Sequence, residues 1–186
     1  MFNAVVVFCF SIFSFLPVDF GSDINLFTIS KGQIKFTSNA PLELIEAETD
    51  ELTGLIDPET KNFAFKVPIA SFVGFNHSLQ REHFNENYME SDKFPDGTFS
   101  GTIQDDLDFS VDGNYEGVSV SGKLSIHGIT VSKELLADIK VEDGQIAISS
   151  NFLIPLKDHK IKIPKILSRK LATIIYVQVD ASLIMR

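Results

Sequence analysis

Four histidines are the side chains of this sequence best suited to acid–base or metal chemistry: His77, His83, His127 and His159. No two of them form an H-x-H or H-E-x-x-H arrangement, so none has the spacing of zinc ligands. His77 and His83 are six residues apart, which fits neither one helix face nor one strand pair. Alternation puts His127 on the polar face of a strand, where we expect it to be exposed. The sequence therefore predicts no metal site and no catalytic histidine.

Serine and carboxylate chemistry have no clear motif either. The nearest approach to a G-x-S-x-G nucleophile elbow is GVSVSG at residues 117–122, which is one residue too long and lies within a strand pattern. Glu82 and Glu86 could face each other on a helical turn, but exposed acids do this routinely. No glycine-rich phosphate loop is present. The sequence favours a non-enzyme, and no cofactor is expected.

Net charge restricts the partners. The chain has 186 residues, which fits one domain, and a formal charge of −9. Nucleic-acid binding requires a basic face, so this charge argues against nucleic acid, and also against attraction of the whole protein to anionic membranes. Six of the sixteen basic residues lie between Lys157 and Lys170. This cluster is interpreted as a solvated loop.

The N-terminus differs in composition from the rest of the chain. Residues 1–16, MFNAVVVFCFSIFSFL, contain no charged side chain. The run is shorter than the roughly 20 residues of a membrane span and suits the apolar core of a signal peptide. We expect a signal peptide over residues 1–22, the alternatives being an uncleaved anchor or a first strand. Cys9, the only cysteine, lies inside it. The mature protein, residues 23–186, is then periplasmic or secreted and not an integral membrane protein.

Alternating apolar and polar residues predict strands after residue 22. The clearest runs are residues 63–69, 118–126 and 146–154, with weaker ones at 99–109 and 131–141. Residues 171–184 are apolar on both faces in their first half, which predicts burial of both faces. Turn residues at 57–60, 112–114 and 142–144 separate the runs and indicate antiparallel neighbours. Roughly eight such strands must bury one face as a sandwich or a closed barrel.

Residues 83–99, HFNENYMESDKFPDGTF, lie between two of these runs without a strand period. The segment also resembles part of a known family. HFNENYMESDKFPDGTFSG is similar to the segment joining the middle strands of the YceI-like family of lipid-binding proteins, in its Bacteroidetes-type form. GKLSIHGIT (122–130) resembles the family's G-x-L-t-i-x-G-v-T, and KIKIPK (160–165) resembles its D-x-x-I-x-I-P-k run. Many members carry R-D-x-H-L where this chain has REHF from residue 81.

The resemblance covers roughly residues 24–186 and implies an all-β, lipocalin-like antiparallel β-barrel of about eight strands, with a short helix or loop between middle strands. It implies a non-catalytic, exported protein that holds a long apolar ligand, in some members a polyisoprenoid. Family members are often dimeric, so a homodimer is a further expectation. The residues expected to line the ligand site are Phe63, Phe65, Val67, Phe75, His83, Phe84, Tyr88, Met89, Phe94, Phe99, Ile148 and Phe152.

Three interpretations of function stay open at this stage. A carrier of an apolar ligand predicts a continuous cavity. A ligand-free interaction module of the envelope predicts a filled barrel and an exposed apolar patch, with the basic segment available to an acidic partner. An enzyme acting on a lipid predicts a histidine or carboxylate with a perturbed pKa inside the cavity.

Overall fold

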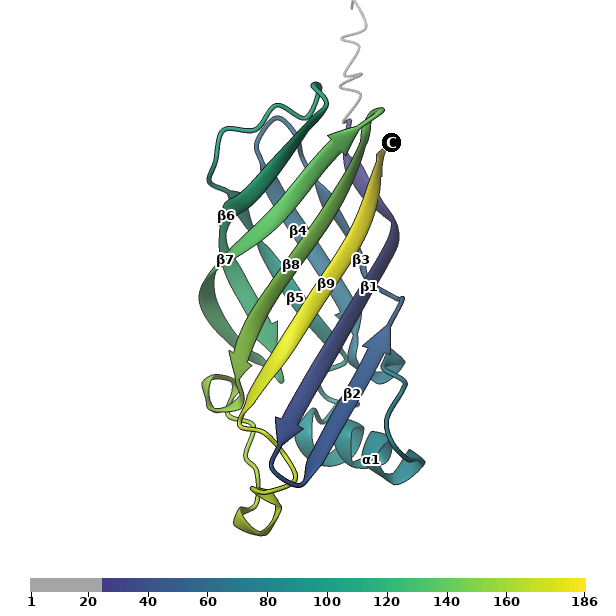
Figure 1. Cartoon of the computed structure of the whole chain (residues 1–186), viewed down its shortest axis with the longest axis vertical. Coiled ribbons are helices and arrows are strands. Elements are labelled where there is room, and N and C mark those ends of the chain that lie inside the picture. The colour runs from purple at the N-terminus through teal and green to yellow at the C-terminus, as the bar shows by residue number, and fades with distance from the viewer. Residues whose placement is uncertain (1–24) are drawn as a thin grey trace, which may run out of the picture.

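The computed structural model describes residues 25–186, so the predicted signal peptide lies outside the described residues. Within this range the chain forms one antiparallel sheet of nine strands (Figure 1). The strands are β1 (Phe27–Ala40), β2 (Glu43–Thr49), β3 (Thr53–Ile56), β4 (Asn62–Pro68), β5 (Asp96–Ile103), β6 (Gly113–Ile126), β7 (Ile129–Glu142), β8 (Gln145–Pro155) and β9 (Ile174–Met185).

Pairing of β1 with β9 closes the sheet into a barrel. On the other side of β1, its second half pairs with β2 and its first residues pair with β3. Both pairings keep one register, as Ala40 opposite Glu43 and Phe27 opposite Ile56 show. The two short strands therefore act as one interrupted strand, and the barrel has eight strands in cross-section. The predicted all-β barrel is confirmed.

Two hairpin turns have positive φ at both of their central residues. Asp143 and Gly144, with φ of 51° and 71°, join β7 to β8 at a predicted Asp-Gly turn. His127 and Gly128, with φ of 52° and 68°, join β6 to β7. Positive φ at both central residues matches the right-handed twist of the flanking strands. The prediction that His127 lies on an exposed strand face was wrong, because its side chain is only 15% exposed in this turn.

Two strand limits also differ from the predictions. The run at 99–109 is a strand only as far as Ile103, and residues 104–112 form an irregular connection with a turn at residues 109–110. The last strand begins at Ile174, where both faces were expected to be buried. Ile174 is 50% and Tyr176 39% exposed on the outside of the barrel, so this expectation was wrong. Apolar residues on both faces allow a strand to be buried on both sides. Burial of the outer face also requires another layer of structure packed against it.

The predicted helical insertion between middle strands is present between β4 and β5. It contains a 3₁₀ turn η1 (Ile69–Ser71), the helix α1 (Ser78–His83) and one π-helical turn η2 (Phe84–Tyr88). Between η1 and α1, Val73 forms two backbone hydrogen bonds with Glu48 of β2, which extends the wall beyond the end of β4. In Figure 1 α1 lies beside β2 at the lower end of the barrel. No described helix is long and apolar enough to cross a membrane.

The two ends of the barrel are filled differently. At the upper end in Figure 1, where β1 begins and β9 finishes, Phe27, Ile56, Ile146 and Leu183 have at most 1% exposure. The Phe27 ring packs on that of Phe109 at a centroid distance of 5.9 Å. This end is a packed core. The other end, which we call the mouth, is bordered by α1, the β1–β2 turn and the segment between β8 and β9.

Glycines let neighbouring strands and aromatic rings approach closely in the wall. Gly101 of β5 stands opposite Gly122 of β6. A Cβ at Gly101 would lie 2.0 Å from the Ser121 carbonyl oxygen, and one at Gly122 would lie 2.9 Å from the Phe99 ring. The Phe99 ring therefore lies directly on bare backbone, in a position that a side chain at Gly122 would occupy.

We expect Gly101→Ala to lower the free energy of unfolding by about 1–3 kcal/mol, because the added methyl group overpacks rigid backbone. Gly97→Ala in the same strand is the matched control. Its methyl group would lie 3.3 and 3.5 Å from the Val67 and Ile69 side chains, and the closest backbone atom of the neighbouring strand, the Val67 oxygen, is at an ordinary contact distance of 4.0 Å. Urea unfolding measures both. Equal losses in the two variants would contradict the close approach at Gly101.

Candidate ligand-binding site

An internal cavity of about 430 Å³ occupies the barrel from its middle to the mouth. Its wall is made by the inward-facing residues of the strands, and its mouth end by α1, η2 and the segment between β8 and β9. Nearly all of the lining is apolar. The volume lies within the range of about 300–1,000 Å³ that small-molecule sites usually have.

Eleven of the twelve residues predicted for a ligand site line this cavity. They are Phe63, Phe65, Val67, Phe75, His83, Phe84, Tyr88, Met89, Phe99, Ile148 and Phe152. The twelfth, Phe94, lies elsewhere: its ring packs edge-on against His127 at 5.0 Å and covers Gly128. Phe94 therefore helps to attach the helical insertion to the barrel instead of lining the cavity.

Two aromatic groups shape the cavity. In one, the Phe84 ring from η2 stacks on Phe36 of β1 at 5.3 Å and lies 5.2 Å from Phe75. In the other, Phe63 lies 5.0 Å from Phe99 and 5.5 Å from Phe65. The first group joins the helical insertion to the wall, so the position of η2 determines the shape of the cavity near the mouth.

Sequence reasoning missed several wall residues. Ile34, Phe36 and Ser38 of β1 line the cavity, and their alternation with polar neighbours could have identified them. Leu124 and Val179 belong to patterns that were recognised as strands, but nothing in a single strand shows which part of its inner face borders a cavity. Leu156, Ile161, Ile163, Leu167 and Leu171 also line the cavity, and sequence reasoning did not assign them to the ligand site although Ile161 and Ile163 belong to the KIKIPK motif.

Polar side chains gather at the mouth. Glu43, His77, Gln80, His83 and Lys170 contribute to the cavity lining there. The Gln80 side-chain amide donates to Glu43, and the His77 ring accepts from the Gln80 backbone N–H, which caps α1. Burial raises the pKa of Tyr88, so its phenol stays neutral near pH 7. Among residues 25–186, no three His, Cys, Asp or Glu side chains converge as metal ligands would.

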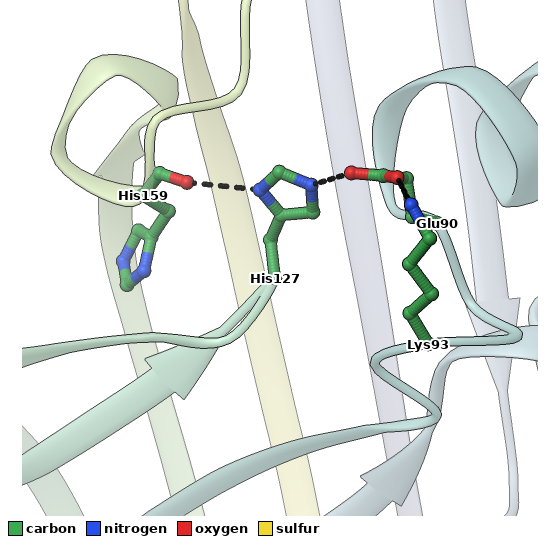
Figure 2. Close-up of polar contacts among 4 residues, drawn as sticks. All are labelled: Glu90, Lys93, His127 and His159. Atoms are coloured by element: carbon green, nitrogen blue, oxygen red, sulfur yellow. Dashed lines mark hydrogen bonds and ion pairs between the residues drawn. The ribbon is translucent and has the colours of Figure 1, made fainter.

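A hydrogen-bonded chain attaches the helical insertion to the barrel (Figure 2). Nδ1 of His127 lies 3.1 Å from the backbone oxygen of His159, and Nε2 lies 2.8 Å from Oε2 of Glu90. Lys93 donates to the other Glu90 oxygen. His159 is fully buried, and its own Nδ1 lies 3.1 Å from the Ile129 backbone oxygen.

Electrostatic attraction between Glu90 and its partners stabilises this hydrogen-bonded chain. Hydrogen bonds from Lys93 and then from His127 hold the pKa of Glu90 below its usual 4.5, and Glu90 in turn raises the pKa of Lys93. A carbonyl and a carboxylate can only accept, so the His127 ring satisfies both contacts when both of its nitrogens carry hydrogen.

The chain also joins the three motifs on which the family resemblance rests. Glu90 and Lys93 belong to the first motif, His127 to the second, and His159 immediately precedes the third. The contacting residues are 37 and 32 positions apart in the sequence and meet at one place at the mouth. A family model for the YceI-like domain matches residues 24–183. The chain belongs to the YceI-like family.

Solved structures share this fold. A polyisoprenoid-binding domain from Saccharophagus degradans, implicated in plant cell wall breakdown, superimposes with a TM-score of 0.72 at 14% identity, over 86% of this chain and 98% of that one. Burkholderia cenocepacia BcnA gives 0.67 at 13%, over 81% and 95%. A Campylobacter jejuni YceI protein gives 0.55 at 21%, over 74% and 83%. No curated protein sequence matches the chain.

We expect the attachment of the insertion to weaken in acid. Because the pKa of Glu90 is lowered in the folded protein, its contribution to stability is complete above 4.5 and is lost as the pH falls through the lowered value. Backbone amides of residues 84–94 should then exchange hydrogen faster. In Glu90→Gln they should already exchange faster at pH 7.

Asp106→Asn is the control for this prediction, because Lys61 lowers the pKa of Asp106 at a distant site. It should leave exchange in residues 84–94 unchanged. If Glu90→Gln exchanges like the native protein at pH 7, the hydrogen-bonded chain does not hold the insertion.

Proposed function

We propose that this protein is an exported, non-catalytic binding protein that sequesters or carries a long apolar molecule, isoprenoid or otherwise lipid-like, inside its barrel. The observation that carries the proposal is the lining of the cavity: it is apolar, extends from Ile56 beside the core around Phe27 to the mouth, and is bordered there by polar residues. Such a cavity suits a chain-like molecule with one polar end at the mouth.

The hydrophobic effect supplies enough free energy for this binding. Burying a methylene group contributes about 0.8 kcal/mol, so ten buried carbons contribute roughly 8 kcal/mol before the cost of ordering the ligand. No polar recognition is needed along the tail. The polyisoprenoid named for the Saccharophagus degradans domain supports this ligand class.

The positions of the titratable groups support a non-catalytic role. The histidines that line the cavity, His77 and His83, both lie on the exposed helical insertion at the mouth, away from the apolar interior. Tyr88 also lines the cavity, but its raised pKa keeps the phenol protonated near pH 7, so it is not available as a general base. Export rests on the composition of residues 1–22, and the periplasm or the exterior is the proposed location. Pairing of two chains stays a prediction.

Native mass spectrometry of protein purified without detergent from its own host tests the proposal. We expect a uniform added mass of several hundred daltons that disappears on denaturation, because burial of a long apolar chain gives slow release. Bare protein that also fails to take up added prenyl lipids would contradict the carrier function and favour the ligand-free interaction module.

Filling the cavity should abolish this uptake. Ala137 is 6% exposed and lines the cavity, so Ala137→Phe places a ring in the ligand's position. The free energy of unfolding should stay within about 1.5 kcal/mol of the native value, because the ring enters existing space. Leu136→Phe, on the outer face of the same strand and 62% exposed at that position, is the matched control and should bind normally. Equal binding by both variants would place the ligand outside the cavity.

A further inference from the structure

The segment between β8 and β9 forms the outermost part of the mouth. In Figure 1 its loop, residues 157–170, extends further than any other described part of the barrel at that end. It contains six basic residues and one acidic residue, whereas the whole chain carries −9. All six basic side chains are exposed, and none forms an ion pair with another described residue. We call residues 157–170 the basic rim.

The basic rim also presents apolar side chains to solvent. Ile166, in the 3₁₀ turn η4 (Lys165–Leu167), is 88% exposed, which is the largest value among the exposed large hydrophobic residues described. Leu42 of the β1–β2 turn is 58% exposed. Its backbone N–H donates to the Arg169 oxygen at 2.8 Å, so the turn and the basic rim are joined. Two exposed apolar side chains therefore lie beside cations that form no ion pair with another described residue.

The inner side of the same segment is part of the cavity wall. Ile163, Leu167 and Lys170 line the cavity, while Ile166 and Lys165 between them are exposed. A partner bound to the outer side of the basic rim would therefore lie next to the entrance through which a ligand passes.

We propose that the basic rim docks the mouth onto an anionic lipid bilayer, with Ile166 and Leu42 entering the interface. The six cations supply attraction to anionic head groups, and the apolar tips supply burial, which together provide the two signals that stable peripheral binding needs. An acidic protein surface would satisfy the charges, but free cations and apolar tips together at the outermost point of the mouth fit the interface of an anionic bilayer, where head groups and acyl chains lie side by side.

The net charge of the protein does not oppose this docking, because the charges are separated. Glu82 and Glu86 are exposed acids on the helical insertion, and in Figure 1 the basic rim extends beyond α1 of that insertion. Screening confines each group's influence to about 10 Å at moderate salt, so the basic rim can approach an anionic surface while the acidic body stays away from it. Docking would place the cavity entrance at a bilayer from which a lipid-like ligand can enter. This loading role rests on the proposed carrier function.

Flotation with phosphatidylglycerol–phosphatidylethanolamine vesicles tests the proposal on the mature chain. We expect the native protein to float with these vesicles and not with phosphatidylcholine vesicles. Lys162→Ala combined with Lys165→Ala should weaken binding by roughly twenty-five-fold, since each basic side chain near the surface contributes about fivefold. Lys31→Ala combined with Lys123→Ala removes the same charge from the barrel wall and should bind like the native protein.

Ile166→Ser separates membrane docking from purely electrostatic attraction. It keeps every charge and should weaken vesicle binding several-fold. Unchanged binding by Ile166→Ser, equal losses in the two lysine pairs, or no flotation of the native protein would each overturn the proposal. The flotation assay is carried out without an added ligand. Failure here therefore leaves the carrier function standing, whereas bare protein in mass spectrometry would remove the carrier function and not the docking.

Discussion

The two hydrogen bonds of the His127 ring connect the β6–β7 turn to two segments that border the mouth of this barrel. On one side they reach the helical insertion through Glu90, and on the other the segment between β8 and β9 through the His159 carbonyl. The insertion presents Phe84, Tyr88 and Met89 to the cavity. The aromatic packing and the cavity shape near the mouth thus depend on a polar contact outside the cavity. Such a contact can be broken and remade at less cost than a packed core, because water can replace its partners.

A barrel of eight strands has an interior that side chains can fill or that can hold one small ligand. This chain does both. Large residues such as Phe27 and Leu183 fill the end opposite the mouth, where they are fully buried. In the remaining part, glycines such as Gly54 and Gly122 let the Phe65 and Phe99 rings lie against bare backbone. Because these rings lie close to the wall, space is left for the cavity inside the barrel. The packed end supplies stability, which the hollow end cannot supply without a ligand.

Much of the fold follows from local rules that act within a few residues. Alternation predicted the strands, and the Asp143-Gly144 pair predicted its hairpin, because both signals arise from backbone geometry. Eleven of twelve proposed site residues line one cavity for the same reason: inward-facing apolar residues of a closed sheet must share one interior. Whether that interior is filled could not be predicted, because a cavity wall and a packed core have the same pattern.

The errors have a common origin in contacts between distant segments. His127 and Phe94 were assigned from their own neighbourhoods, yet their roles depend on each other and on residues more than thirty positions away. The same holds for Ile174, whose apolar side chain meets no covering layer. The sequence by itself determined the strands, the turns, the family and the apolar character of the interior. Only the tertiary structure decided which end is hollow and where the insertion is attached, because these depend on barrel closure bringing separate segments together.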